Sequence, residues 1–424
     1  MVQLVALDVG VRWIRRRREH LGGGQARHGL SITDPASAGA RGTSLASFRR
    51  VQSRYLELLD PRDDRAERIW RDLERRAFRP PYFLSWGWVE NWLGALPESR
   101  LPQLAVIHEH GVPAAACWLG FQRERRHLVM DSDVYYFNVT GVPRHDELCI
   151  EHNGLVAAPG ADRSLAGLID MLPGDWDEVV LPAVDRYAFD DLGSSARLAR
   201  YRVRVEREAS APFVDLAAVR AARGDYASLL GSSTRTQVRR ARRMLGEMKV
   251  DIAHDESSAL DIYGELLRLH ARQAAERGQR GAFADPWFEQ FHRRLILGRV
   301  RHGEIQLVRV RAGDRTIGCL YNFVYGGRVL FYQCGFGRLD SAPHVKLGYV
   351  CHAAAIEHNA RVGHAVYDLL GGTPAHKERL ATSTTRLVWL RVQRPLARFS
   401  IEESLRRWKQ VLTAVPRRLA LRPA

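Results

Sequence analysis

The sequence predicts a mixed α/β protein that contains two similar units, one after the other. Three observations predict this fold class. The chain has 424 residues, which is enough for two hydrophobic cores of ordinary domain size. Two apolar, turn-punctuated stretches, about 200 residues apart, each have the pattern of a three-stranded meander. Each stretch is followed by a helical segment and a short apolar strand, which is the order expected for a mixed sheet covered by helices.

The first unit is predicted from three strands, one helix and one returning strand. The first two strands cover residues 103–107 and 112–121, and a third strand starts at residues 127–130. The helix covers 164–172, and the returning strand covers 177–181. A helix that follows a meander and leads back to a strand beside it gives a mixed sheet.

The second unit repeats this order. Its strands cover residues 306–310, 316–325 and 329–336, its helix covers 346–362, and its returning strand covers 364–370. Gly-Asp and Gly-Gly pairs separate the strands of the meander, and such pairs are typical of tight hairpins. The repeated order indicates an internal duplication.

A helix-rich segment connects the two units. Helices are predicted over residues 226–248, 257–276 and 286–297 from their apolar spacing. Ser257 and Asp285 are candidate residues for the helix starts, because Ser and Asp side chains accept hydrogen bonds from the first free backbone N–H groups.

These elements divide the chain into four parts. Residues 1–45, with scattered Gly, Ser and Pro and a basic cluster, are predicted to be a disordered tail. Residues 46–215 form the first unit, which begins with a helical stretch over about 44–76. Residues 216–398 form the second unit, and residues 399–424 form a C-terminal helix and tail.

Charge and hydropathy restrict the classes of function. The net charge is +16, which suggests acidic partners. Only four of the 64 basic residues are lysine, a skew typical of G+C-rich coding sequences, and the arginines are dispersed. Nucleic acid is therefore not the favoured partner. No apolar run approaches the ~18 residues of a membrane span, and no secretory signal is seen, so we expect a cytoplasmic protein.

The cysteines do not indicate a disulfide framework or a metal site. There are five, and no two have CxxC spacing. Cys117, Cys319 and Cys334 lie in apolar, strand-like runs, so we expect buried thiols in a reducing compartment. No metal ion is expected.

A loop between a strand and a helix is the first candidate for ligand binding. Residues 331–336 form the strand, residues 337–345 form the loop, and the helix then begins. The free N–H groups of a helix N-terminus bind phosphate, although any strand-to-helix turn has this geometry. His344 and Lys346 add positive charge at this turn, which suits the pyrophosphate of coenzyme A.

A second candidate segment follows the returning strand. Asp368 ends a buried strand, Gly371 and Gly372 follow, and Lys377 comes shortly after. Functional groups gather at the carboxyl ends of parallel strands. Asp368 is predicted to accept a proton from a nucleophile or to orient it, and a structural ion pair is the alternative. Lys377 is predicted to neutralise a phosphate or an oxyanion, and a surface lysine is the alternative.

These segments together resemble a known family. The basic stretch 233–243, the meander 303–336 with the Gly348 helix, and the stretch 367–380 resemble GNAT-superfamily acetyltransferases of the CelD/BcsL group, associated with cellulose and exopolysaccharide biosynthesis. They are more distantly similar to FemAB-type peptidoglycan aminoacyltransferases. The resemblance covers about residues 220–395.

The resemblance implies two tandem GNAT-like domains with a cleft between them and an acyl-CoA co-substrate. In such folds two central parallel strands diverge, here residues 329–336 and 364–370, and the pantetheine arm lies between them. The acceptor attacks the thioester directly, with positioning and a backbone donor for the oxyanion supplying most of the catalysis. The implied catalytic residues are Asp368, Lys377 and Tyr332, and the implied acyl-CoA-binding residues are Gln333, Gly335, His344, Lys346, Gly348, Gly371 and Gly372.

The sequence also departs from the family pattern. His376 stands where the family usually has Tyr, and Leu369-Leu370 replaces an aromatic residue. The first unit has no comparable Asp-Gly-Gly-Lys loop, so we expect a degenerate domain that shapes the acceptor side. Residues 131–138 and 147–153, which are polar and aromatic, are candidates to face the acceptor.

The resulting functional hypothesis is an N- or O-acyltransferase. It uses acetyl-CoA or another acyl-CoA and modifies a saccharide or a related cell-envelope precursor. A transferase of the FemAB kind, which depends on aminoacyl-tRNA, is the first alternative. A basic nucleic-acid-binding protein without catalysis is the second. The oligomeric state is left open.

Overall fold

The computed structural model describes residues 54–402, except 127–129, 175, 187–191, 193–194, 196–198, 340–341, 343–344 and 373–374. The predicted tail over residues 1–45 lies outside the described residues, as does most of the predicted C-terminal segment 399–424.

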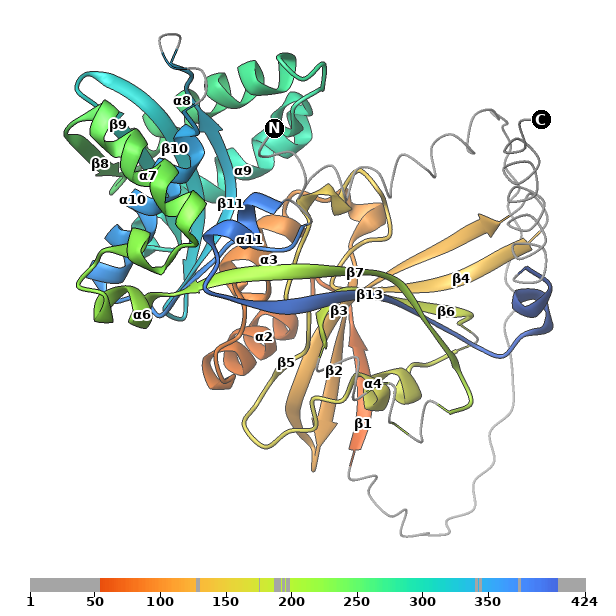
Figure 1. Ribbon diagram of the computed structural model, residues 1–424. Helices are drawn as coiled ribbons and strands as arrows, with labels where there is room; N and C mark the ends of the chain where they lie inside the picture. Colours follow the sequence, from red (N-terminus) through yellow and green to blue (C-terminus); the bar gives the residue numbers. More distant parts are fainter. Residues whose placement is uncertain are drawn as a thin grey trace, which may run out of the picture.

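One thirteen-stranded mixed sheet runs through the molecule (Figure 1). Its strand order is β1-β2-β3-β4-β6-β13-β7-β12-β11-β10-β9-β8, and β5 pairs with β3. The strands are β1 (Arg54–Leu59), β2 (Gln103–Glu109), β3 (Val112–Arg126), β4 (Met130–Phe137), β5 (Val156–Ala157), β6 (Glu178–Asp185), β7 (Arg202–Asp215), β8 (Met248–Ile252), β9 (Ile305–Ala312), β10 (Arg315–Tyr325), β11 (Arg328–Phe336), β12 (Val366–Asp368) and β13 (Ser383–Gln393).

The strand order confirms the predicted duplication and the mixed α/β class. In the first unit, β1 to β4 are antiparallel, β6 runs parallel to β4, and β13 runs antiparallel to β6. In the second unit, β8 to β11 are antiparallel, β12 runs parallel to β11, and β7 runs antiparallel to β12. The two units therefore have the same six-strand order, as two tandem GNAT-like domains require.

The last strand of each unit is exchanged between them. β7 follows the first unit in the chain but completes the second, and β13 follows the second unit but completes the first. β7 and β13 pair with each other from Arg202–Gln393 to Phe213–Ser383, and Figure 1 shows them as two long ribbons between the units. This pair joins the two sheets into one.

The helices follow the predicted order, with three corrections. The predicted helix over residues 44–76 is wrong in its middle part, because residues Arg54–Leu59 form β1 and the helix begins at Asp64. The helix predicted over 226–248 is interrupted after a short 3-10 turn. Asp255 rather than Ser257 starts the helix predicted over residues 257–276, through a capping box with Ser258. The helices are α2 (Asp64–Arg76), α3 (Trp86–Leu93), α4 (Leu165–Met171), α6 (Leu216–Ala221), α7 (Ser232–Leu245), α8 (Glu256–Ala275), α9 (Pro286–Arg299), α10 (Leu347–Val362) and α11 (Ala375–Leu380).

None of the helices in the described part of the chain has both the length and the apolar character needed to cross a bilayer. The thiols of Cys117, Cys319 and Cys334 are buried, as predicted.

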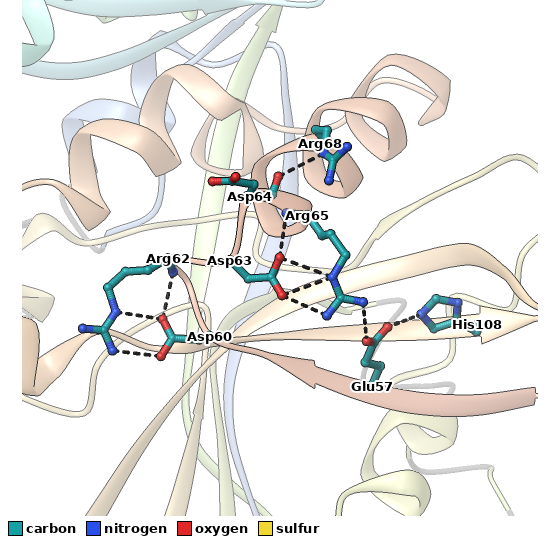
Figure 2. A network of polar contacts seen from close by, with 8 residues as sticks. All are labelled: Glu57, Asp60, Arg62, Asp63, Asp64, Arg65, Arg68 and His108. Atoms are coloured by element: carbon teal, nitrogen blue, oxygen red, sulfur yellow. Dashed lines mark hydrogen bonds and ion pairs between the residues drawn. The ribbon is translucent and has the colours of Figure 1, made fainter.

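Charged side chains fix the corner between β1 and α2 (Figure 2). The Asp63 carboxylate accepts a hydrogen bond from the backbone N–H of Arg65 at 2.8 Å and so caps α2. The Arg65 side chain then reaches Glu57 on β1 at 2.9 Å, and Glu57 contacts His108 on β2, also at 2.9 Å. The first helix is thus tied to the outer two strands of the sheet.

A single aromatic core connects the two units. Trp88 on α3 is almost fully buried and lies 5.2 Å from Phe291 on α9 and 5.6 Å from Phe323 on β10, measured between ring centroids. Trp92, one helical turn after Trp88, is also buried. Because aromatic pairs in this arrangement add to the free energy of burial, we expect the units to be held together rigidly.

Candidate active site

The parallel strands β11 and β12 diverge at the centre of the second unit, as the resemblance implied. They pair only from Arg328–Val366 to Leu330–Asp368. β12 then ends, while β11 continues to Phe336. None of the strands that the structure describes pairs with this edge of β11 beyond Leu330. The N–H of Phe336, at the far end of this stretch, donates to the Gln273 side chain at 3.2 Å. The part of the edge nearest Leu330 is where the backbone of a ligand could pair.

A β-bulge lies at the point of divergence. Tyr321 pairs with Gln333 and Asn322 pairs with Phe331, so Tyr332 is an extra residue on β11. Such bulges are frequent beside active sites because they redirect a side chain and leave a backbone group unpaired. The Tyr332 hydroxyl donates to the carbonyl oxygen of Leu148 in the first unit at 2.9 Å, and burial raises the pKa of this phenol well above its usual range.

Asp368 ends β12 as the centre of a buried ion cluster. Its carboxylate lies 3.0 Å from Nε2 of His152 and 2.8 Å from the guanidinium of Arg328, and it accepts the backbone N–H of Leu370 at 2.8 Å. Burial acts to raise the pKa of Asp368, but the charges of His152 and Arg328 outweigh it and lower the pKa to about 2. The carboxylate is thus ionised and fully paired at neutral pH.

His152 connects Asp368 to the first unit. Its Nδ1 lies 3.0 Å from Asp185 at the end of β6. Burial acts to lower the pKa of the imidazole, but Asp368 and Asp185 raise it to about 10. A protonated imidazole can thus pair with the buried carboxylate of Asp368 and with the partly exposed carboxylate of Asp185.

Lys377 is buried rather than exposed, which excludes the surface-lysine alternative. Its ammonium donates to the carbonyl oxygens of Leu370 at 3.2 Å and Gly371 at 3.0 Å. Burial lowers its pKa, and the nearby carboxylates of Glu151 and Asp368 oppose that shift. α11 therefore places the Lys377 side chain against the loop that follows β12.

The structure requires glycine at both Gly371 and Gly372, for different reasons. Gly372 has φ +140°, which an L side chain rarely adopts. The N–H of Gly371 donates to Glu151, and a Cβ at Gly371 would lie 3.1 Å from the nearer carboxylate oxygen. The loop thus needs a flexible residue at one position and a small residue at the other.

Two residues of the first unit complete the site, and sequence reasoning did not single them out. Glu151 and His152 lie in the polar stretch 147–153, which was predicted only as a possible acceptor-facing segment. Both contact the loop that follows β12, more than 200 residues away in the chain. Their signal in the sequence is an acid-histidine pair in an apolar surrounding, which is weak without its distant partners.

The other predicted acyl-CoA-binding residues are spread over β11 and the start of α10. Gln333 is buried on β11, while Lys346 precedes α10, is exposed and places its ammonium 5.7 Å from the Tyr349 ring. A Cβ at Gly335 would lie 2.7 Å from the backbone oxygen of Leu266 on α8, and one at Gly348 would lie 2.9 Å from the Phe336 ring. Packing therefore explains both of these glycines. His344 lies outside the described residues.

Within the described ranges, His, Cys, Asp and Glu side chains do not gather in threes in a way that could hold a metal ion. The chemistry available at the site comes from a strand edge, a lysine, a tyrosine and the acids.

The comparisons with known proteins agree with this geometry. Residues 232–378 match the acetyltransferase (GNAT) domain family, and this range begins at α7 and ends just after Lys377. No curated protein matches the chain. The match shows a GNAT acetyltransferase domain within the second unit.

Solved structures show how far the fold likeness extends. The crystal structure of FemX is 9% identical, covers 76% of this chain and 95% of its own, and superposes with a TM-score of 0.51. The C-terminal domain of a putative lysylphosphatidylglycerol synthetase from Agrobacterium fabrum is 14% identical, covers 66% and 81%, and has a TM-score of 0.43. A tandem GNAT protein from the clavulanic acid biosynthesis pathway is 12% identical, covers 81% and 99%, and has a TM-score of 0.41.

Proposed function

We propose that this protein is an acyl-CoA-dependent N- or O-acyltransferase that modifies a saccharide or a related cell-envelope precursor. The observation that carries the proposal is the free edge of β11 beyond Leu330, with a bulge at Tyr332, inside a matched GNAT acetyltransferase domain. The pantetheine amides of an acyl-CoA pair with such an edge, and the thioester then lies beside the bulge. The acceptor class and the CelD/BcsL group rest on the sequence resemblance.

The residues around this edge have distinct roles in the proposal. A backbone N–H at the bulge donates to the oxyanion that forms when the thioester carbonyl is attacked, and the Lys377 ammonium adds positive charge on the other side. Lys346 and the first turn of α10 bind the pyrophosphate, together with His344. Gln333 and the Gly371-Gly372 loop line the two sides of the pantetheine arm.

Asp368 orients the site in this proposal. A carboxylate whose pKa is about 2 and which contacts two cations holds almost no proton near neutral pH and is a weak base. Its contacts with His152 and Arg328 instead fix the loop that carries Gly371. Of the two roles predicted for Asp368, orientation fits the geometry, and the structural ion pair is the means by which it orients.

The test of the donor is direct. The protein is titrated with coenzyme A, acetyl-CoA and longer acyl-CoAs while its melting temperature is followed, and CoA release is then measured with a panel of amino sugars, sugars and simple amines. We expect at least one acyl-CoA to raise the melting temperature, since a ligand that binds only the folded state stabilises it. If no acyl-CoA changes the melting temperature, the proposal fails.

An aminoacyl-tRNA-dependent transfer is a second candidate, favoured by the fold likeness to FemX and by the basic helix α7. Arg239 and Arg240 on α7 are exposed, although Arg239 pairs with Asp225 at 3.0 Å. RNA that copurifies with the protein and dissociates steeply with salt would favour this candidate. Binding of RNA without any transfer reaction would instead favour the non-catalytic nucleic-acid-binding alternative.

A further inference from the structure

The space between the parallel strands of the first unit is filled by its own chain. β4 pairs with β6 only from Val134 to Tyr136 and ends at Phe137, while β6 continues to Asp185. Beyond that point Asn153 takes the place of β4, through a parallel bridge to Val184. In the second unit the corresponding space beside β11 has no such segment among the described residues.

Two buried asparagines fix the filling segment. The side-chain amide of Asn138 donates to the Asn153 side-chain oxygen at 2.7 Å, and the Asn153 amide donates to the carbonyl oxygens of Phe137 and Pro182, both at 3.0 Å. The backbone N–H of Asn153 also donates to Ala183 at 3.0 Å. Such a satisfied buried network is rigid, so the residues next to it are held in place.

Those neighbouring residues are Glu151 and His152, and both reach the second unit. His152 is anchored at both ring nitrogens, by Asp185 and Asp368. Glu151 accepts the N–H of Gly371 and is 6% exposed. The segment that closes the first unit therefore delivers a carboxylate to the loop beside the free edge of β11.

Glu151 meets the groups that surround this edge. Four groups affect the pKa of its carboxyl: the Lys377 ammonium on α11, the Gly371 N–H, His152 and Asp368. The charge of Glu151 in turn affects the pKa of three groups: the Tyr332 hydroxyl of β11, the Cys149 thiol and the Arg207 guanidinium of β7. Burial raises the pKa of Glu151, and Lys377 and the Gly371 N–H oppose that rise. The pKa of Asp368 is lowered instead, so Asp368 is the weaker base of the two carboxylates.

We propose that Glu151, supplied by the first unit, is the general base of the transfer reaction in the second unit. This inference rests on the proposed function. The Glu151 carboxylate takes the proton of the acceptor N–H or O–H, and the acceptor lone pair forms a bond to the thioester carbon. The C–S bond breaks and the electron pair leaves with the thiolate of coenzyme A. The proton on Glu151 passes to water, and the thiolate takes up a proton from water, so atoms and charges balance.

The test measures acyl-CoA binding and catalytic turnover separately in the variant Glu151→Gln. We expect its dissociation constant for the acyl-CoA found above to stay within about twofold of the wild-type value, while kcat falls by about 100-fold or more, the scale of a lost general base. We expect kcat/KM of the wild type to rise with pH as Glu151 loses its proton, and this rise should be absent in Glu151→Gln. Glu98→Gln, which removes an exposed carboxylate of the same unit, is the control and should match the wild type.

The possible outcomes distinguish the role of Glu151 from the proposed function as a whole. Glu151→Gln with normal kcat and normal acyl-CoA binding removes Glu151 as the base and leaves the proposed function intact. If the wild-type protein binds no acyl-CoA, both the role of Glu151 and the proposed function are contradicted. If Glu151→Gln does not fold, the variant Glu151→Asp is used instead, because it keeps the charge beside Lys377. A reduced kcat with a retained pH dependence would then support Glu151 as the general base. An unchanged kcat would contradict that role. Calorimetric titration should also show one acyl-CoA per chain, and two would contradict the filled first unit.

Discussion

His152 is the residue through which the two units share charge. Its imidazolium lies 3.0 Å from a carboxylate of each unit, at Asp185 and at Asp368, and it has a left-handed backbone with φ +53°. Removal of one member of a buried ion pair leaves the other charges without compensation, which costs more free energy than the intact pair contributes.

We therefore expect His152→Gln to lower the free energy of unfolding by about 3 kcal/mol, because Asp368 would lose one of the two cationic side chains that contact it and keep Arg328. Denaturant unfolding followed by circular dichroism measures this change. Arg186→Gln, in which an exposed ion pair with Glu208 is lost, is the control and should cost less than 1 kcal/mol. Equal losses in the two variants would contradict a special role for His152.

The pH dependence of stability follows from the same residue. The pKa of His152 is about 10 in the folded protein, compared with 6.5 for a histidine in the unfolded chain. Between these two pH values the folded state therefore binds one more proton than the unfolded state. Its contribution is complete below pH 6.5 and is lost as pH rises toward 10. We expect the stability difference between the wild type and His152→Gln to shrink over this window. A difference that is constant from pH 6.5 to 10 would show that His152 is neutral in the folded state.

At the scale of elements, α8 and β11 are in contact through Gly335. A Cβ at this position would lie 2.6 Å from the Cβ of Leu269, 2.7 Å from the oxygen of Leu266 and 2.8 Å from the nitrogen of His270. Two of these atoms are backbone, so the helix itself would have to move.

We expect Gly335→Ala to destabilise the protein by about 1–3 kcal/mol through this overpacking. Gly264→Ala is a matched control on α8, because a Cβ there meets nothing within 4 Å and Ala is the better helix former by up to about 1 kcal/mol. Thermal unfolding of both variants measures the contrast. If Gly335→Ala is as stable as the control, α8 is not held against β11 as described.

The elements also show where the sequence was informative. Both meanders and the helices α4, α8, α9 and α10 were predicted from local periodicity, which depends on neighbouring residues alone. β1 was predicted as a helix because its six residues, Arg-Tyr-Leu-Glu-Leu-Leu, have no strict alternation and precede a true helix. The roles of Glu151 and His152 could not be predicted, because their partners Gly371 and Asp368 come from the other unit and no local pattern connects them.

At the scale of the whole molecule, the aromatic core and the exchanged strands make the two units interdependent. Trp88 of the first unit is 1% exposed and packs on Phe291 and Phe323 of the second. We expect Trp88→Ala to cost about 3–5 kcal/mol and to lower the stability of both units together, in one transition. Hydrogen exchange read separately in each unit checks this, and a loss of protection confined to the first unit would contradict it.

A fragment of residues 216–398 is predicted not to fold by itself, although it contains the matched GNAT domain. It lacks β7, so β12, which has three residues, would lose its antiparallel neighbour, and β13 would lose both of its neighbours. Circular dichroism and acyl-CoA binding of the purified fragment test this. The fragment 202–398, which restores β7, is the comparison, and a folded 216–398 fragment would contradict the prediction.

The exchanged strands also affect the order of events while the chain is being made. β6 is complete at Asp185, but its antiparallel neighbour β13 ends only at Gln393. At about 5–20 residues per second, a ribosome needs roughly 10–40 s to synthesise the intervening stretch. During that time the nascent first unit has an unpaired strand edge that other chains could join. Assembly of the first unit is therefore delayed until β13 has been synthesised, and the yield of the protein in cells should depend on protection of the growing chain by chaperones.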